Sequence, residues 1–428
     1  MADRLRALFC DHLSILRGKY LPGAKATSGH TRFCQSTFGV HYDKDLLPSP
    51  GSMMMEGLPD MELRWDMAEA RASWAEDEQV VLGDLYDAAG NPLPMCPRGA
   101  LKRAVADWGK HGLSPKIGIE LEAFALVRSD DGFEPYDNPG GVVYGTGPFT
   151  DPAGFNDAIW AMAEELGFEL DMITAEYDTP QFEYTLTFGD AVKAVDEIVL
   201  FRQMAREIAL EYGVLLTFLP KPLADKGGSG MHINFSFADS DGNNALANGD
   251  VGGPDAMNDL ARGCVAGLVH HHKGLAGLIA PTANSYARLQ PASLSGYWQN
   301  WGGDHRNVTT RVSGEGGAKA RLEHRMADAS ANPYTAVAAV LQAARLGYEG
   351  KYELPAMETG DGFETTDTDQ GVAADLAGAI DDLMADTALC AAVGQGLVDN
   401  HVFMKQAEVE KTAGLEGDAQ RDFYVWFV

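Results

Sequence analysis

The fold is decided by one stretch, Lys116–Val127, which reads KIGIELEAFALV. Apolar residues alternate there with Gly118, Glu120 and Glu122, and successive side chains of a strand point to opposite faces, so a strand is predicted. Its second face carries two carboxylates two residues apart, which is unfavourable unless positive charge lies over them. An isolated E-x-E is typical of a solvated face, so the interpretation depends on whether the pattern recurs.

The pattern recurs in three further stretches, in which polar residues again occupy one face of an alternating segment. These stretches are Gln181–Phe188, Gly227–Phe237, which begins with a Gly-rich turn, and Ala320–Arg325. Their polar faces carry Glu183, then His232, Asn234 and Ser236, then Arg321, Glu323 and Arg325. A further carboxylate, Glu176, lies seven residues before Glu183. Four strands are thus expected to offer five carboxylates and one imidazole.

The composition limits the class of protein. The chain has 428 residues, of which 45% are hydrophobic and 22% charged, enough for a large core and more than one domain. The formal net charge of -29 argues against nucleic acid or an anionic membrane as a partner.

The cysteines and the hydrophobic runs bear on the compartment. The five cysteines are far apart and form no C-x-x-C pair, which indicates neither a disulfide framework nor a zinc site and fits a reducing cytosol. We find no secretory h-region with a cleavage site and no run of the roughly 20 apolar residues that a membrane span needs. A cytoplasmic protein is predicted.

The order of elements predicts two domains. Residues 1–100 are short, turn-rich segments, expected to be mostly β, and residues 101–428 contain the four alternating stretches. Asp190 is expected to cap a helix over Asp190–Tyr212. Beyond residue 335 helix predominates, with a polar break over Glu358–Gln370. The other predicted elements are strands at Gln79–Tyr86 and Val214–Leu219 and helices at Arg98–Gly109 and Phe155–Gly167.

Five carboxylates and an imidazole can share one pocket only with cations. Hard divalent ions with oxygen ligands, Mg²⁺ or Mn²⁺, fit this set better than zinc does. Five arginines lie between Arg288 and Arg325, and guanidinium groups hold phosphate oxygens in a bidentate manner. Together with the Gly-rich turn they indicate phosphoryl transfer from a nucleotide. No Walker A sequence is present, so a P-loop enzyme is excluded.

Four motifs carry a resemblance to a known family. In order after IELE (119–122) they are GSGMH (228–232), NSYARL (284–289), RLEHR (321–325) and NPY (332–334). As a set they resemble the glutamine synthetase superfamily over nearly the whole chain. The resemblance implies an α+β fold, with an N-terminal β-grasp domain (1–100) and a catalytic domain (101–428) built on a curved antiparallel sheet, a half-barrel funnel flanked by helices.

The resemblance also implies roles for individual residues. One metal ion would be held by Glu120, His232 and Glu323, and a second by Glu122, Glu176 and Glu183. The nucleotide-contacting positions are Asp171, Phe188, Asn234, Ser236, Arg311 and Arg321, and Asn234 stands where the family usually has a second histidine. The substrate-contacting positions are Gly228, Arg288 and Arg325, with Glu122 and His232 beside them. Arg306 would stabilise the transferred phosphoryl group.

The implied reaction joins glutamate to an amine with ATP and Mg²⁺ or Mn²⁺. A carboxylate is a poor acyl donor because oxide is a very poor leaving group. The γ-carboxylate is therefore first phosphorylated to γ-glutamyl phosphate, and an amine then displaces phosphate. The catalytic residues expected for these steps are Arg306, Arg325, Glu183 and Asp178. The resemblance further implies a homo-oligomer of stacked rings, a decamer or a dodecamer.

Two departures from the family pattern bear on the amine. Leu294 stands where glutamine synthetases carry a flap glutamate, and residues 37–43 lack their Asp-Gly-Ser-Ser loop. Losing both acidic groups favours an alkylamine over ammonium, and within the family the sequence resembles the branch that uses methylamine. A γ-glutamylpolyamine synthetase acting on putrescine and an ammonia-using glutamine synthetase are the alternatives. Tyr177, Trp298 and Trp301 are candidates for apolar walls.

Several other interpretations stay open at this stage. Asp178 is either the base that deprotonates the amine or a turn-stabilising residue. His270–His272 are consecutive in a helix and point in different directions, which favours a structural role over a metal cluster. An inactive regulatory relative of the family would lack metal ligands or arginines, and a guanidino kinase would not need six metal ligands.

Overall fold

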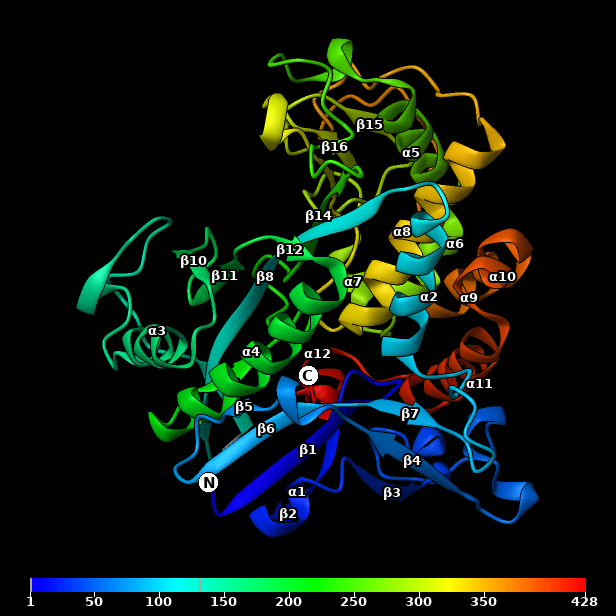
Figure 1. Cartoon of the computed structure of the whole chain (residues 1–428). Coiled ribbons are helices and arrows are strands. Elements are labelled where there is room, and N and C mark those ends of the chain that lie inside the picture. Colours follow the sequence, from blue (N-terminus) through cyan, green and yellow to red (C-terminus); the bar gives the residue numbers. More distant parts are fainter. Residues whose placement is uncertain (1, 131) are drawn as a thin grey trace.

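The predicted central strand forms as β8, Ser114–Ser129, in the computed structural model, which describes residues 2–130 and 132–428. It belongs to a ten-stranded sheet in which β10, β11, β8, β14, β17, β16 and β15 follow one another, with β9, β12 and β13 also paired to β8. Figure 1 shows β8 crossing the middle of the molecule. The other strands are β9 Gly132–Pro135, β10 Leu170–Ala175, β11 Gln181–Leu186, β12 Gly189–Asp190, β13 Leu215–Thr217, β14 Met231–Ala238, β15 Trp301–Gly302, β16 Thr310–Val312 and β17 Leu322–His324.

Two smaller sheets form the N-terminal region. One has the order β2, β1, β6, β5 and the other the order β3, β4, β7. Their strands are β1 Arg4–Cys10, β2 Leu16–Pro22, β3 His30–Cys34, β4 Asp60–Arg64, β5 Arg71–Ala72, β6 Glu78–Leu82 and β7 Asp84–Tyr86. Leu5, Phe9 and Phe38 belong to a separate hydrophobic cluster in this region. The expected boundary at residue 100 stays a prediction.

The helices lie against the large sheet and against one another. They are α1 Gly23–Ala26, α2 Pro97–Gly109, α3 Phe155–Leu166, α4 Ala191–Glu211, α5 Asp259–His270, α6 His272–Ile279, α7 Ser285–Arg288, α8 Pro333–Gly350, α9 Leu376–Ala385, α10 Thr387–Val393, α11 Gln395–Thr412 and α12 Gly417–Tyr424. Short 3-10 turns lie at Gln35–Gly39, Pro50–Ser52, Met54–Glu56, Met67–Glu69, Gly147–Phe149, Pro254–Ala256 and Gly317–Lys319. Helices α2 and α4 contact β8, and α8 packs against α2, α4, α5 and α6 (Figure 1).

The main core lies between the large sheet and these helices. The apolar face of β8 contributes Ile117, Ile119 and Leu121, all buried, to a cluster shared with α4 and α8. At the start of α8 the Asn332 side chain accepts hydrogen bonds from the backbone N–H groups of Tyr334 and Thr335, which satisfies donors that the helix leaves free. The α+β fold with a curved antiparallel sheet is confirmed, and the sheet stays open rather than closing into a barrel.

Three details of the predicted elements differ from the structure. The Gln79–Tyr86 segment is divided at Gly83 into β6 and β7, which belong to different sheets; a Cβ at Gly83 would lie 2.5 Å from the carbonyl oxygen of Arg64. The Val214–Leu219 strand is only three residues long, as β13. The Asp190 side chain does not cap α4, because its carboxylate accepts a hydrogen bond from Lys116 Nζ at 2.6 Å instead.

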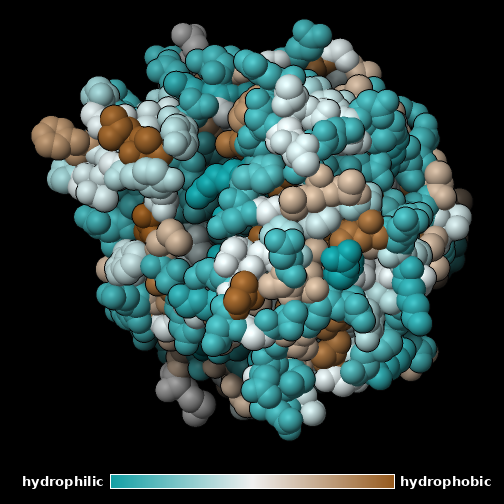
Figure 2. Space-filling model, turned by 90° about the horizontal axis from the view of Figure 1, so that it is seen from above, coloured by the Kyte–Doolittle hydropathy of each residue, from teal (hydrophilic) through white to brown (hydrophobic). Residues whose placement is uncertain are grey.

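The surface agrees with the acidic composition. Figure 2 shows that hydrophilic residues cover most of the face in view, with hydrophobic ones in small, separate groups. Among the helices of residues 2–130 and 132–428, none combines the length and the apolar character that crossing a membrane requires.

Candidate active site

Strand register brings the predicted ligands together. Strands β11, β8, β14 and β17 are neighbours in this order, so their polar faces adjoin. Glu183 pairs with Glu122, His232 pairs with Glu120, and Asn234 pairs with Glu323. Directly opposed residues of an antiparallel pair have their Cβ atoms about 4.5–5.5 Å apart, which places all these side chains within reach of one another.

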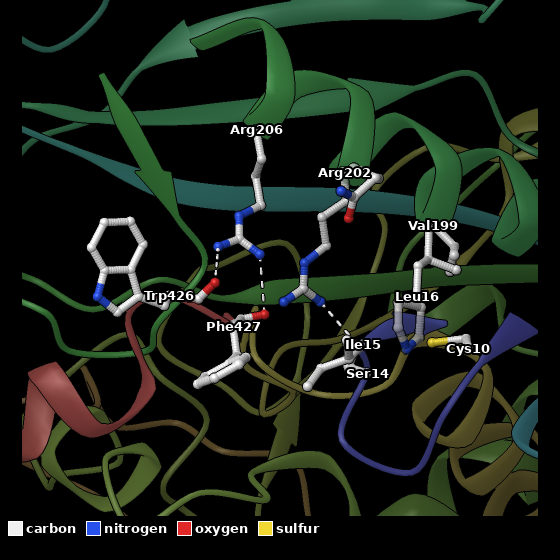
Figure 3. Close-up of a pocket in the computed structure, with 11 residues that line it drawn as sticks. Cys10, Ser14, Ile15, Leu16, Val199, Arg202, Arg206, Trp426 and Phe427 are labelled. Atoms are coloured by element: carbon white, nitrogen blue, oxygen red, sulfur yellow. Dashed lines mark hydrogen bonds between the residues drawn. The ribbon is translucent and has the colours of Figure 1, made fainter. Parts of the chain in front are cut away.

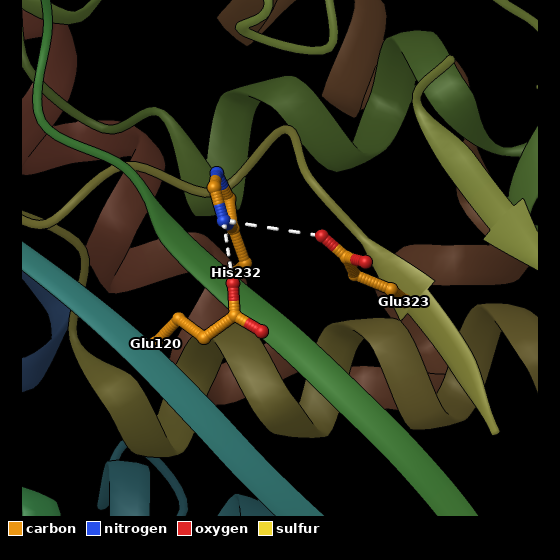
Figure 4. Close-up of side chains that lie close together, drawn as sticks. All are labelled: Glu120, His232 and Glu323. Atoms are coloured by element: carbon orange, nitrogen blue, oxygen red, sulfur yellow. Dashed lines mark hydrogen bonds and ion pairs between the residues drawn. The ribbon is translucent and has the colours of Figure 1, made fainter. Parts of the chain in front are cut away.

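The first group of donors contains Glu120, His232 and Glu323, whose ligand atoms lie within 4.8 Å of one another. His232 Nδ1 is 3.1 Å from Glu120 Oε2 and 3.9 Å from Glu323 Oε1. Figure 4 shows the three side chains converging from three adjacent strands. Asn234 orients the Glu120 carboxylate of this group, because its Nδ2 donates a hydrogen bond to Glu120 Oε1 at 3.0 Å.

The second group contains Glu122, Glu183 and, again, His232. The other ring nitrogen, Nε2, lies 3.8 Å from Glu122 Oε1, so the one imidazole is shared between the two groups. The prediction assigned His232 to the first group alone and Glu176 to the second. Glu176 lines the same cavity as Glu122 and Glu183 but is not part of that compact triad.

The two groups differ in their electrostatics. Burial would raise the pKa of Glu120, but hydrogen bonds from His232 and Asn234 and the charge of Arg325 outweigh it and lower the pKa to about 2. Burial and the charges of Glu120, Glu122 and Glu176 raise the pKa of Glu183 to about 9. Burial and the charge of Glu122 also raise the pKa of Glu176. Negative charge is therefore in excess on the β11 side of the site.

A pH dependence of stability follows from Glu183. Its pKa is raised from 4.5 to about 9, so in this interval the folded protein holds a proton that the unfolded chain releases. The folded state binds more protons, and stability falls as the pH rises through this interval. We expect cation-depleted protein to unfold at a lower temperature at about pH 8.5 than at about pH 6, with a flatter profile for Glu183→Gln. The measurement is the unfolding temperature of each protein across this pH range, with the exposed Glu165→Gln as the control. Parallel profiles for the unsubstituted protein, Glu183→Gln and Glu165→Gln would contradict the prediction.

The donor set fits hard divalent cations. Four carboxylates and one imidazole match the oxygen-rich ligand preference of Mg²⁺ and Mn²⁺. The raised pKa of Glu183 shows that these carboxylates lack sufficient counter-charge from the side chains around them. A cation at either group would supply that charge.

Arginines border the first group. Arg311 Nη1 donates to Glu323 Oε2 at 2.6 Å, and Arg325 Nη1 donates to Glu323 Oε1. Among the residues that the structure describes, the buried Nε atoms of Arg311 and Arg325 have no hydrogen-bond partner. Buried donors without acceptors are rare, so these two mark places where anionic oxygens of a ligand would be stabilised.

A cavity of about 570 Å³ opens beside the second group. Its lining includes Glu122, Glu176, Asp178, Gln181, Glu183, Gly228, His232, Arg288, Arg306 and Arg325. The Gly-rich turn fits closely here, because a Cβ at Gly228 would lie 2.5 Å from Arg288 Cγ. The Asp178 carboxylate accepts a hydrogen bond from the Gly227 N–H, so it ties the loop before β11 to this turn.

The structure brings together only some of the residues that were predicted to contact the nucleotide. Phe188, 64% exposed, and Asn234 both flank Gly118, where an added Cβ would lie 3.3 and 3.7 Å from their Cβ atoms. Ser236 pairs with Lys116 on the adjoining strand. Arg321 donates instead to Glu315, and Asp171 is exposed at a register shift of β10. The nucleotide roles of these residues stay predictions.

Some residues of the cavity were not singled out from the sequence. Gln181 Nε2 donates to Glu122 Oε2 at 3.2 Å and to the Gly228 carbonyl at 3.0 Å. Alternation along β11 places Gln181 on the face of Glu183, which would have identified it. Tyr144 and Phe363 also line the cavity, but they belong to irregular segments that carry no periodic pattern.

Other candidates lie elsewhere. Trp298 lines a separate cavity, and Trp301 is buried with its Nε1 donating to the Pro355 carbonyl, so neither is a wall of the 570 Å³ cavity. His271 Nδ1 lies 2.6 Å from Asp386 Oδ2, and His272 Nε2 lies 3.0 Å from the Tyr297 carbonyl oxygen. These contacts agree with a structural role for this histidine run.

Comparison with known sequences supplies relatives of the chain. Residues 94–424 match the family model described as the glutamine synthetase catalytic domain. The glutamine synthetase of Halobacterium salinarum is 30% identical over 358 residues, covering 80% of this chain and 74% of that protein. A glutamate–isopropylamine ligase from a Pseudomonas species is 28% identical over 304 residues, covering 69% of this chain and 66% of that protein.

Solved structures agree over almost the whole chain. A crystal structure described as a novel glutamine synthase homolog superposes with a TM-score of 0.86 at 26% identity, covering 100% of this chain and 99% of that one. The ligand-free structure of GmaS, a γ-glutamylmethylamide synthetase, gives a TM-score of 0.84 at 25% identity and covers 99% of this chain and 96% of that one.

Proposed function

The chain belongs to the glutamine synthetase family of ATP-dependent ligases, and on this premise we propose that it joins the γ-carboxylate of glutamate to methylamine. The family expected from the motifs is thereby confirmed. The observation that carries the choice of amine is the composition of the 570 Å³ cavity, where apolar side chains lie beside carboxylates. The similarity to GmaS and to an isopropylamine ligase supports this choice.

We assign the phosphoryl transfer to the space between the two donor groups and the arginines. Glu120, His232 and Glu323 would hold one divalent cation and Glu122, Glu183 and Glu176 the other, with His232 beside both. When bound, these cations neutralise the phosphate oxygens and the γ-carboxylate. Arg306 and Arg325 line the same cavity, which supports assigning them the role of stabilising negative charge on the transferred group.

In the second step an amine attacks the acyl carbon of γ-glutamyl phosphate and phosphate leaves. A methylammonium ion must first lose a proton, and a carboxylate within hydrogen-bond reach can accept it. Asp178 lines the cavity and is held by the Gly227 N–H. We assign it the role of general base, because Glu183 is committed to the cation.

The walls of the cavity suit a small alkyl group. Tyr144 and Tyr177 lie edge to face with ring centroids 6.5 Å apart, and Leu294, 41% exposed, and Phe363 also line the cavity. Burying one methyl group contributes about 0.8 kcal/mol, which is roughly a fourfold preference. A larger effect is expected from the absence of a carboxylate at Leu294, because ammonium without an alkyl group depends more on such a partner.

A side-by-side amine panel tests this proposal. We expect kcat/KM for methylamine to exceed that for ammonia, ethylamine and putrescine, because the cavity offers apolar walls and three of its four carboxylates, Glu122, Glu176 and Glu183, are assigned to the cation. The measurement is ADP release with ATP, glutamate and each amine, together with the mass of the amide. A higher kcat/KM for ammonia would make the chain a glutamine synthetase, and a higher value for putrescine would favour a polyamine ligase.

The role of Asp178 is tested in the same panel. Asp178→Asn keeps the size of the side chain and removes the proton acceptor, so we expect amide formation to slow by about a hundredfold or more. The KM for ATP should be nearly unchanged. An unaltered rate of amide formation would show that Asp178 is not the general base and that its role is limited to its hydrogen bond with the Gly-rich turn.

A further inference from the structure

A second cavity shares no lining residue with the 570 Å³ cavity. It has a volume of about 170 Å³ and is enclosed by the turn between β1 and β2, by α4 and by the segment after α12. Figure 3 shows two arginines of α4, Arg202 and Arg206, extending toward this cavity from one side. Ser14 and the backbone of Trp426 and Phe427 face them.

Arg202 has no acidic partner. It is only 6% exposed, and its one hydrogen bond runs from Nη1 to Ser14 Oγ at 3.1 Å. Its guanidinium also lies over the Phe218 ring, 4.9 Å from the centroid. Among residues 2–130 and 132–428, no carboxylate oxygen lies within 4.0 Å of Arg202, and its Nε and Nη2 have no acceptor. A buried cation of this kind is costly unless a counter-charge is supplied.

Within the part of the chain that the structure describes, Arg206, one helical turn later, donates only to neutral acceptors. Its Nη1 and Nη2 donate to the carbonyl oxygens of Phe427 and Trp426, both at 3.0 Å. Burial lowers the pKa of both guanidinium groups, and the positive charge of Arg202 lowers that of Arg206 further. Two like charges therefore face one cavity, and among the described residues neither forms an ion pair with a carboxylate.

The charges of Asp328 and Glu207 act on this pair, but neither carboxylate forms an ion pair with it among the described residues. Glu207 accepts hydrogen bonds from Arg6 at 2.8 and 3.1 Å and from Gln203 at 2.6 Å. Asp328, which is fully buried, accepts from Ser330 with Oδ1. Among the described residues its Oδ2 has no hydrogen-bond partner. Burial lowers the pKa of Arg202, and the charge of Asp328 opposes this without an ion pair within 4.0 Å. Of the other buried arginines, Arg98 is paired with Asp84 and Asp196. In the described part of the chain the buried Arg288 donates only to backbone carbonyl oxygens, but it lines the 570 Å³ cavity. In a chain of net charge -29, two arginines without an ion pair at one cavity outside the reaction site are unusual.

We propose that this cavity binds a small oxyanion of the phosphate class. The free Nε and Nη2 of Arg202 offer the fork that guanidinium presents to phosphate oxygens, Ser14 adds a hydroxyl, and Arg206 adds positive charge. A volume of 170 Å³ admits a phosphate group and excludes a nucleotide. The anion would join the N-terminal sheet, α4 and the segment after α12, so it stabilises their packing.

The first test is thermal unfolding of the full chain with phosphate, sulfate, succinate or chloride at constant ionic strength. Binding to the folded state alone raises Tm in a saturable way. We expect this for phosphate and sulfate, a smaller effect for the dicarboxylate succinate, and none for chloride. Arg202→Gln should weaken phosphate binding at least tenfold, whereas exposed Arg262→Gln on α5 should not. Equal shifts with every salt and in every variant would overturn the proposal.

Two further variants separate this cavity from the reaction site and from misfolding. Arg306→Ala, which alters only the 570 Å³ cavity, should retain the phosphate response. If Arg202→Gln does not fold, the fluorescence of Trp426 reports on the unaltered cavity, because the carbonyl oxygen of this residue accepts a hydrogen bond from Arg206 beside the cavity. A saturable change on phosphate addition that Trp426→Phe loses supports the site, and no change in the unsubstituted protein contradicts it.

Discussion

Replacing His232 with alanine is expected to lower kcat by at least about a thousandfold, because divalent cations contribute several kcal/mol to such a reaction and each 1.36 kcal/mol is tenfold. His232 faces Glu120 with Nδ1 and Glu122 with Nε2, so one substitution disturbs both donor groups. The measurement is ADP release at saturating ATP, glutamate and methylamine over a range of Mg²⁺ and Mn²⁺ concentrations. More cation should be needed for any residual rate.

The control for His232→Ala is His270→Ala, since His270 is exposed on α5 and lines only the separate cavity beside Trp298. It should behave like the unsubstituted protein. A His232→Ala protein with the original rate and cation dependence would contradict the assignment of both donor groups as divalent-cation sites.

The second large effect is expected at Arg306. This side chain lines the 570 Å³ cavity, and its charge acts against the raised pKa values of Glu176 and Glu183. Arginines that stabilise a transferred phosphoryl group contribute about 10³–10⁵ in rate, so Arg306→Ala should lower kcat by about a thousandfold. The KM values for ATP and glutamate should change far less, because this stabilisation arises in the transition state.

Steady-state kinetics of Arg306→Ala and Arg306→Lys test this assignment, with Arg262→Ala as the control for loss of one exposed arginine. The lysine variant should recover part of the rate, since it restores the charge but not the planar fork. An Arg306→Ala protein in which KM rises and kcat is unchanged would make Arg306 a binding residue only.

The periodicity of four short stretches was enough to predict the sheet and its polar face. Alternation along Lys116–Val127 and Gly227–Phe237 placed the carboxylates and His232 on one side of their strands, and the structure has these strands as neighbours. The motifs predicted the family and the α+β fold with a curved antiparallel sheet, both confirmed. Such features depend on local patterns, which a sequence displays directly.

The sequence does not display the pairing register of the strands or which distant segments lie side by side. His232 borders both donor groups because it pairs with Glu120, and Asp190 binds Lys116 because β12 pairs with β8 at that point. Trp298 and Trp301 are distant in the sequence from Lys116–Val127. Packing alone decides that Trp298 borders a separate cavity and that Trp301 is buried. The cavity at Arg202 joins Ser14 and Phe427, more than 400 residues apart, so no local pattern marks it.

The most direct test of the account uses glutamate labelled with ¹⁸O in both γ-carboxylate oxygens. If the γ-carboxylate is activated as an acyl phosphate and methylamine then displaces phosphate, one labelled oxygen passes to phosphate in each turnover and the other stays in the amide. Mass spectrometry of both products should show one ¹⁸O in phosphate for every γ-glutamylmethylamide formed. Phosphate free of ¹⁸O, or its release without any amide, would contradict the proposed reaction.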